Sequence, residues 1–407
     1  MLYFFLLISL IINPYILLLV NTSISKFKLP KIYSILVIIY FFIFTNLRTH
    51  GEFLYTSTGD DSDDYTLGII RVMNDYSIID ILRGKADPFL DHIDVIFALY
   101  QLFLAKVFTP ENIPILCSIT FAILIVSTLF SYSLISKGII ELRSKLLISL
   151  IIINPYIIYL NQHLFRQAIS LGVMLSISIP LFLRLFINEK YIKNKKLVSI
   201  FFVLSILLAL GLHRGSTIPI LILFSISTIL SSGLLNQFYL LFKKFILGRR
   251  LILIIFLILS SLILFSITKK YLDVFLLYTF FDLKIRSNAT GLRTALIGII
   301  ISLYSIYIIY KNSLKIYFKK SLKSLLLIFS ISNLLISIFC FLTPGGIVRL
   351  LFSTNVIILT MVTITHNFDK KLIKLFAFLM GILTYLFYVF LREGFWGKGN
   401  YFLPYLN

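Results

Sequence analysis

An aspartate-rich run, Gly59-Asp60-Asp61-Ser62-Asp63-Asp64-Tyr65, is the densest group of ionisable residues in the 407-residue chain. Ten of the seventeen acidic residues lie between Leu47 and Ile96, a stretch with apolar segments on both sides. Paired carboxylates can act as a general base or orient the hydroxyls of a sugar. A solvated loop and a loosely bound divalent cation are alternatives. An EF-hand is excluded, because the run lacks the glycine at position six and the glutamate at position twelve.

Five arginines form a second candidate group, since each lies at or within a turn of one end of an apolar segment. They are Arg48, Arg166, Arg214, Arg293 and Arg349. The planar guanidinium fork binds phosphate oxygens in pairs and stays charged. Together the five predict a site for a phosphate at a membrane surface, and therefore for a lipid-linked phosphate. The alternative for each of them is an arginine that reaches lipid headgroups.

His213 closes one of these apolar segments and directly precedes Arg214. Histidine exchanges a proton near neutral pH, which suits the deprotonation of a hydroxyl. The alternative is a histidine that is hydrogen-bonded to a neighbouring carbonyl group. The sequence therefore offers two candidate bases, the imidazole of His213 and a carboxylate of the aspartate-rich run.

The composition indicates an all-α, polytopic membrane protein. Hydrophobic residues make up 59% of the chain and charged residues only 14%, which is far less charge than a soluble domain of this size carries. The net charge of +21 could suggest a nucleic-acid partner. However, the basic residues form short clusters between apolar runs, which is the positive-inside pattern, so no nucleic-acid partner is expected.

The apolar runs predict about twelve spans in a single membrane domain over residues 1–407. The predicted ranges are 2–20, 32–46, 113–135, 146–161, 166–187, 197–213, 216–232, 251–268, 293–310, 324–342, 347–365 and 375–391. The six loops that then face the cytoplasm hold 22 of the 38 basic residues and three acids. Both termini are predicted outside, and the first run is expected to be a retained anchor, because Lys26, Lys28 and Lys31 follow it.

The loop over residues 47–112 is predicted to face away from the cytoplasm. Its segment Asp94–Phe108 is apolar but short and amphipathic, and counting it as a span would place most lysine clusters outside. We expect it to lie along the outer membrane surface as an interfacial helix, with a partner around Tyr65–Leu82. A true span, combined with a re-entrant segment elsewhere, is the alternative.

The order of these motifs resembles the EpsG family of Wzy-type polysaccharide polymerases. The resemblance runs from about Leu47 to Ile220 and continues more thinly to Arg349. It rests on Leu47-Arg48, Gly59-x-Asp61-x-x-x-Tyr65, Asp94-x-x-Phe97-x-x-x-x-x-Leu102, Phe165-Arg166-Gln167-Ala168-Ile169, Leu212-His213-x-x-Ser216, Arg293 and Arg349. The chain departs from the family pattern in its extra aspartates, in Asp94 where a glutamate is common, and in Arg214 directly after His213.

The resemblance implies a polymerase of the bacterial inner membrane with a periplasmic active site and a fold similar to GT-C glycosyltransferases, with membrane-lying helices after the second span. Its substrate would be an oligosaccharide repeat linked to undecaprenyl diphosphate. Expected further partners are a chain-length regulator and a flippase of the same pathway. The implied catalytic residues are His213, Asp60, Asp61 and Asp63. The implied binding residues are Arg48, Tyr65, Asp94, Arg166, Arg214, Arg293 and Arg349.

No cofactor or metal is expected, because the arginines already supply positive charge and no Rossmann glycine pattern occurs. The alternatives are another lipid-phosphate glycosyltransferase, an O-antigen ligase and, in a different class, a flippase or transporter for the lipid-linked oligosaccharide. Transporters bury charges near the membrane midplane, whereas the ionisable residues here crowd one face.

Overall fold

The computed structural model describes residues 79, 95–108, 113–135, 165–188, 194–231, 288–342, 348–367, 374–375 and 378–379. Within these ranges the chain is almost entirely helical and has no strand, and an isolated antiparallel β-bridge joins Ile187 to Phe318. For this part of the chain, the predicted all-α class is confirmed.

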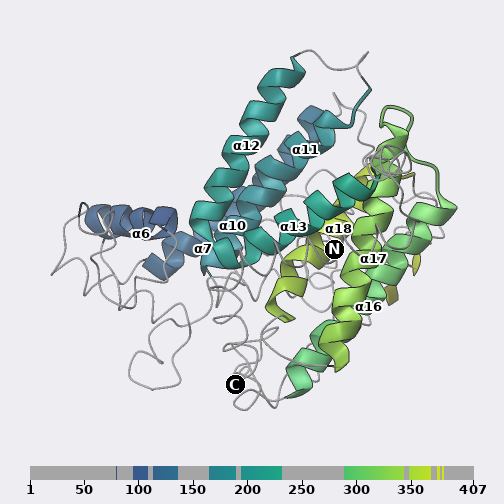
Figure 1. The fold of residues 1–407 in the computed structure, drawn as a ribbon. Coiled ribbons are helices and arrows are strands. Elements are labelled where there is room, and N and C mark those ends of the chain that lie inside the picture. Colours follow the sequence, from purple (N-terminus) through teal and green to yellow (C-terminus); the bar gives the residue numbers. More distant parts are fainter. Residues whose placement is uncertain are drawn as a thin grey trace, which may run out of the picture. The chain divides into compact units, whose positions relative to one another are not determined.

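The helices coincide with the predicted apolar segments (Figure 1). Their bounds are α6 Val95–Val107, α7 Ile113–Ile135, α10 Phe165–Val173, α11 Ile179–Leu185, α12 Lys195–Leu212, α13 Arg214–Ser231, α16 Asn288–Lys311, α17 Lys320–Leu342 and α18 Val348–Thr365. The largest shift is at α16, which starts five residues before the predicted 293. Predicted spans 2–20, 32–46, 146–161, 251–268 and 375–391 lie wholly or mostly outside the described residues, so the total of twelve stays a prediction.

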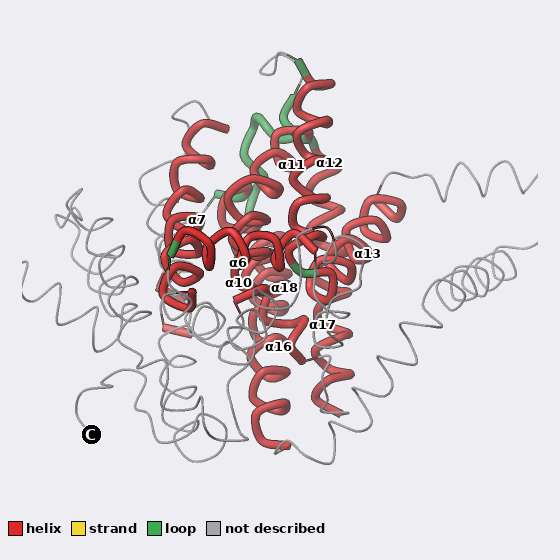
Figure 2. The backbone as a smooth tube through the Cα atoms, turned by 90° about the vertical axis from the view of Figure 1, so that its left-hand side faces the viewer, coloured by secondary structure: helices red, strands yellow, loops and turns green. Residues whose placement is uncertain are grey.

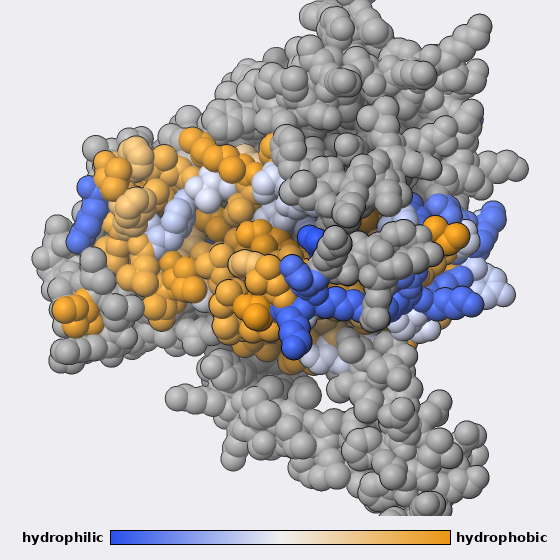
Figure 3. All heavy atoms as spheres, turned by 90° about the horizontal axis from the view of Figure 1, so that it is seen from above, coloured by the Kyte–Doolittle hydropathy of each residue, from blue (hydrophilic) through white to orange (hydrophobic). Residues whose placement is uncertain are grey.

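Among the described residues, three helices are long and apolar enough to cross a membrane: Phe165–Leu185, Lys195–Leu212 and Lys320–Ile338. α12 exposes a large apolar face that includes Leu197, Phe201 and Leu204. Figure 3 likewise shows hydrophobic side chains over much of the visible described surface. Such a surface is unfavourable in water but matches lipid tails, so the chain has the character of a helical membrane protein.

The described helices fall into two compact units. Unit 1 holds α6, α7, α10, α11, α12, the start of α13 to Pro219, residues 315–318 and the end of α18 from Leu359. Unit 2 holds the rest of α13, α16, α17 and the part of α18 up to Ile358. These units are groups of packed helices and do not test whether residues 1–407 form a single membrane domain. That organisation therefore stays a prediction.

Unit 1 is built on an antiparallel hairpin of α10–α11 and α12, with α7 packed against α10 and α6 lying crosswise to them (Figures 1 and 2). Glycines permit the close approaches. A methyl group added at Gly172 of α10 would lie 3.0 Å from Leu124 Cβ of α7. One added at Gly211 of α12 would collide with Cγ1 and Cδ1 of Ile96 of α6 and would lie 3.1 Å from its Cβ. α6 therefore crosses α12 two residues before His213.

A π-helical turn, Met174–Ser178, joins α10 to α11. Pro180 follows within the first two positions of α11. Proline has no backbone N–H and its ring collides with the carbonyl four residues earlier, here that of Ser176, so the backbone there departs from α-helical pairing. The turn separates the half of the span that carries Arg166 from the half that carries Arg184.

Unit 2 is built on an antiparallel hairpin of α16 and α17, which lie side by side in both views (Figures 1 and 2). Gly298 of α16 faces Ser337 of α17, and Ser302 lies opposite Asn333, so the pairing advances in opposite directions along the two helices. α18 begins six residues after α17 ends. The starts of α16 and α18 and the end of α17 therefore lie at the same end of unit 2.

Candidate functional site

Five of the predicted site residues lie within described helices or the turn between them: Arg166, His213, Arg214, Arg293 and Arg349. The side chains of Arg166 and His213 are described and are partly buried, and for the other three the backbone is described. Arg48, Asp60, Asp61, Asp63, Tyr65 and Asp94 lie outside the described residues. The structure therefore describes the helical part of the candidate site.

His213 ends α12 and separates it from α13. Its backbone is extended, with φ −160° and ψ 98°, and its N–H donates to the carbonyl oxygen of Ala209 at 3.0 Å. α13 begins at the next residue, Arg214, two residues earlier than predicted. A histidine in this position is carried by a one-residue turn between two helices, so its direction depends on that turn.

Two buried hydroxyl groups bind the backbone of this turn. Ser170 of α10 donates to the carbonyl oxygen of Ala209 at 3.0 Å. Thr217 of α13 donates to the carbonyl oxygen of His213 at 2.8 Å, and the same hydroxyl lies 3.2 Å from the carbonyl oxygen of Ala209. The two hydroxyl oxygens are 3.0 Å apart. One polar cluster thus joins α10, α12 and α13 at a single level.

This cluster brings the elements that carry Arg166 and His213 together. Arg166 lies four residues before Ser170 and His213 four residues after Ala209. Residues four apart share a helix face, and α10 and α12 are antiparallel, so both candidates lie about one turn from the cluster at the same end of the hairpin. Both side chains are partly buried.

In unit 2, Arg293 and Arg349 are also brought to one end. Arg293 lies in the second turn of α16, two residues before Ala295, and Arg349 is the second residue of α18, two before Leu351. Ala295 and Leu351 are both fully buried and belong to one hydrophobic cluster with Cys340 of α17. Because residues two apart lie on opposite sides of a helix, the two arginine positions share this end of unit 2 without sharing the buried face of the cluster.

An amide cluster lies one to two turns deeper in unit 2. The Asn333 amide nitrogen donates to Ser302 Oγ at 2.8 Å and to Asn355 Oδ1 at 2.7 Å, and Ser337 donates to the Asn333 carbonyl oxygen at 2.7 Å. All four side chains are fully buried. Hydrogen bonds of this kind hold transmembrane helices together, so the cluster fixes α16, α17 and α18 below Arg293 and Arg349.

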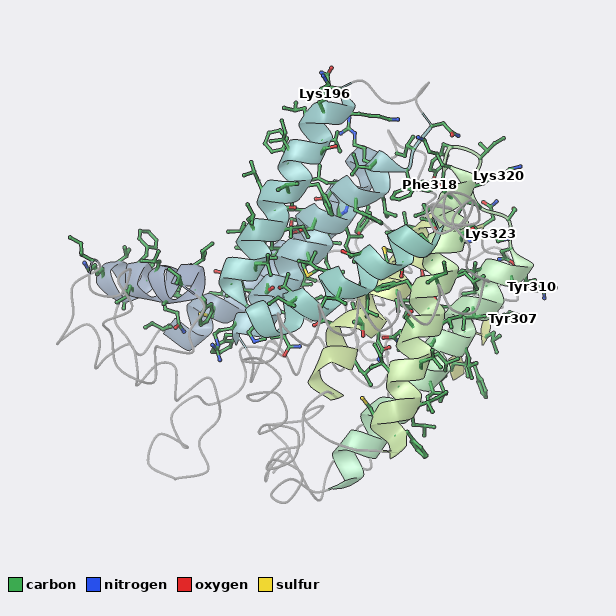
Figure 4. All side chains as sticks on the ribbon, viewed as in Figure 1. Lys196, Tyr307, Tyr310, Phe318, Lys320 and Lys323 are labelled. Atoms are coloured by element: carbon green, nitrogen blue, oxygen red, sulfur yellow. The ribbon has the colours of Figure 1, made fainter. Side chains whose placement is uncertain are left out.

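The two ends of each hairpin differ in charge. Lys196 lies at the far end of α12 (Figure 4), about 26 Å from His213 along the helix at a rise of 1.5 Å per residue. In unit 2, Lys320 and Lys323 of α17 lie near Tyr307 and Tyr310 of α16 (Figure 4), at the end opposite Arg293 and Arg349. Lysine clusters thus mark one end of each hairpin and the candidate residues mark the other.

No Asp or Glu occurs in the described residues, although fourteen Lys and Arg residues do. The positive charge of Arg166, Arg293 and Arg349 therefore has no carboxylate counter-charge within the same helices. Anions that neutralise these groups must come from the rest of the chain or from a ligand. Within the described ranges, no group of three or more His, Cys, Asp or Glu residues could hold a metal ion.

Ser170 and Thr217 were not among the residues predicted from the sequence. A signal was present, because each follows a predicted site residue by one helical turn: Arg166 by four residues and His213 by four. Their pairing across 47 residues is a property of the fold and is absent from the sequence pattern.

No protein-family model, curated protein or solved structure matches the chain.

Proposed function

We propose that the chain is a Wzy-type polysaccharide polymerase with a GT-C-like fold, which joins oligosaccharide repeats carried on undecaprenyl diphosphate. The observation that supports the proposal most strongly is the placement of the candidate residues. Arg166 and His213 share one end of the first hairpin, and Arg293 and Arg349 share one end of the second unit. The remaining support is the ordered motif set of the sequence.

In the proposed reaction, a hydroxyl oxygen of the acceptor repeat attacks the anomeric carbon of the growing glycan. The bond between that carbon and the diphosphate oxygen breaks, and the diphosphate leaves with the bonding electrons. Arg166, Arg293 and Arg349 bind the diphosphate and stabilise the charge that it gains. The hydroxyl proton moves to His213 or to a carboxylate among Asp60, Asp61 and Asp63.

The other predicted residues bind the glycan or the phosphate from the rim of the site. Arg48, Tyr65 and Asp94 belong to the loop over residues 47–112, and Arg214 begins α13 next to His213. α6, which crosses α12 close to Gly211, would be the membrane-lying helix of a GT-C-like fold. In this arrangement the loop faces the periplasm and the lysine ends of the hairpins face the cytoplasm.

A transporter for the same lipid-linked oligosaccharide is the alternative from a different class. The amide cluster around Asn333 is the feature that bears on it, because transporters bind substrates near the midplane. That cluster is uncharged: the Asn333 amide nitrogen bonds Ser302 and Asn355, and Asn333 Oδ1 and Asn355 Nδ2 have no hydrogen-bond partner among the described residues. A diphosphate requires cations, so the arginine-bearing ends are the better match and the polymerase is favoured.

The orientation is tested by cysteine labelling in intact spheroplasts. Ser62→Cys should react with an impermeant maleimide, and Ser313→Cys, in the turn between α16 and α17, should not. The reverse pattern would place the candidate residues on the cytoplasmic side and would contradict the proposal.

The activity is tested with the purified chain and a lipid-linked repeat. We expect polymers of increasing length, and we expect His213→Ala to lower kcat with less effect on KM for the lipid-linked donor, because a proton acceptor matters mostly in the transition state. In cells, loss of the gene should leave glycans of a single repeat. Complete absence of surface glycan would indicate an initiating enzyme or a flippase instead, and long chains confined to the inner membrane would indicate a ligase.

A further inference from the structure

The hydroxyl groups of Ser170 and Thr217 make more hydrogen-bonding contacts than they have protons to donate. Each hydroxyl carries one proton, yet the two oxygens make four contacts, to each other and to the carbonyl oxygens of Ala209 and His213. The shortest distance to a carbonyl oxygen is 2.8 Å, from Thr217 to His213, so the Thr217 proton is best assigned there. The Ser170 proton is then shared between the Ala209 carbonyl and the Thr217 oxygen.

The Thr217 bond by itself is ordinary. A threonine hydroxyl often donates to the carbonyl four residues earlier in its own helix. What is specific to this chain is that the acceptor belongs to the residue between two helices. The corresponding backbone bond, from Thr217 N–H to the His213 carbonyl, is 3.3 Å long, so the hydroxyl supplies the shorter contact.

The Ser170 bond comes from another helix and acts on the other side of His213. The Ala209 carbonyl also accepts the His213 N–H at 3.0 Å. The peptide group that follows His213 is thus bonded to Thr217 directly, and the one that precedes it is linked to both hydroxyls through the shared Ala209 carbonyl oxygen. Because those peptide planes determine where the Cβ atom points, the pair fixes the Cα–Cβ bond from which the imidazole projects.

We propose that Ser170 and Thr217 are positioning residues that hold the imidazole of His213 in its working direction beside α10. The effect of this role on catalysis rests on the proposed function, whereas the positioning of His213 does not. Neither hydroxyl touches the substrate, since both are fully buried. Their contribution is to the geometry of the proton acceptor, and it reaches the reaction through His213 alone.

The first test is kinetic. Thr217→Val keeps the shape but removes the hydroxyl, and Ser170→Ala removes the other. Each should lower kcat about tenfold, which corresponds to about 1.4 kcal/mol, while KM for the lipid-linked donor stays within about twofold. Thr217→Ser should retain most of the activity. Ser205→Ala is the matched control, because Ser205 is a buried serine that donates only within α12, to Phe202.

The decisive experiment makes Thr217→Val and Ser170→Ala in a chain that also carries His213→Ala. If the hydroxyls act through His213, Thr217→Val should lower the residual rate by less than about twofold there. A further tenfold loss in that background would overturn the proposal, because the hydroxyls would then act by another route. An unchanged kcat in both Thr217→Val and Ser170→Ala would overturn it as well.

A measurement that does not depend on polymerase activity separates this inference from the proposed function. In a His213→Cys chain, the rate at which a maleimide alkylates the new thiol reports the exposure and direction of position 213. Thr217→Val or Ser170→Ala should change that rate about fivefold or more, and Ser205→Ala should not. If the rate changes but the wild-type chain never polymerises repeats, the positioning role stands and the proposed function fails. An unchanged rate in both variants overturns the positioning role.

Discussion

Units 1 and 2 carry their candidate residues near one end of a helical hairpin, but they fix that end by different means. In unit 1 two hydroxyls bind backbone carbonyls at a turn, so the cluster controls the direction of a single residue, His213. In unit 2 an amide joins three continuous helices, so the cluster controls the distance between helices. A change in unit 1 should therefore alter rate more than stability, and a change in unit 2 should alter stability first.

The largest effect on stability is expected from Gly298→Val. A Cβ atom at this position would lie 3.2 Å from Ser337 Cβ and 3.3 Å from Asn355 Nδ2, and closer still to Ser337 Oγ. Valine forms helices slightly better than glycine, by a few tenths of a kcal/mol, but overpacking costs about 1–3 kcal/mol, so the collision prevails. We expect a Tm several degrees lower for the purified chain. Leu303→Val, at a lipid-exposed position of the same helix, is the control, and equal Tm values for both variants would argue against close packing of unit 2.

Asn333→Ala should have the next largest effect. It removes the donor to both Ser302 and Asn355, but bonds between transmembrane helices contribute about 0.6 kcal/mol on average, so a loss of about 1–2 kcal/mol is expected. Thermal unfolding measures this loss. Ser330→Ala, which removes a bond within α17 to Leu326, should change Tm much less. If Asn333→Ala lowered the rate at unchanged Tm, the contrast between the units would be wrong.

The smallest effect on stability is expected from Gly211→Ala in unit 1. Alanine gains about 1 kcal/mol over glycine inside a helix, but its Cβ atom would collide with Cγ1 and Cδ1 of Ile96, which must move to another rotamer at a cost of about 1 kcal/mol, so Tm should change little. The turn and α6 should nevertheless shift, and the polymerisation rate should fall a few-fold. Ile96→Ala in the same chain makes room and should restore part of the rate. A large fall in Tm with an unchanged rate would contradict the account.

The fold could be predicted from the sequence where apolar runs end at charged residues. Ile113–Ile135 and the end of α18 at Thr365 were predicted to the residue, because hydrophobicity alone decides where a helix can lie in a membrane. The polar clusters could not be predicted in this way. Ser170 and Thr217 are 47 residues apart and Asn333 and Asn355 are 22 apart, and hydrophobic periodicity does not say which buried polar groups will meet.

The candidate site was predictable only as a set of helix ends. The sequence placed Arg166, His213, Arg293 and Arg349 at the ends of apolar segments, and the structure adds which ends are neighbours within each unit. The starting residue of α16 was missed, because Asn288-Ala289-Thr290-Gly291 is too polar for the run of apolar residues to include it. Arg293 consequently lies inside a helix instead of at its start.

The proposed binding of a diphosphate by the arginines at the helix ends is tested most directly by measuring the binding of undecaprenyl diphosphate to the purified chain. Lysine keeps the charge but loses the paired hydrogen bonds, and a charge-assisted bond contributes about 1.5–3 kcal/mol. Arg166→Lys in unit 1 and Arg349→Lys in unit 2 should therefore each raise Kd about tenfold or more. Arg184→Lys, at the opposite end of the span that carries Arg166, should leave Kd unchanged. Unchanged binding in both test variants would contradict the proposal.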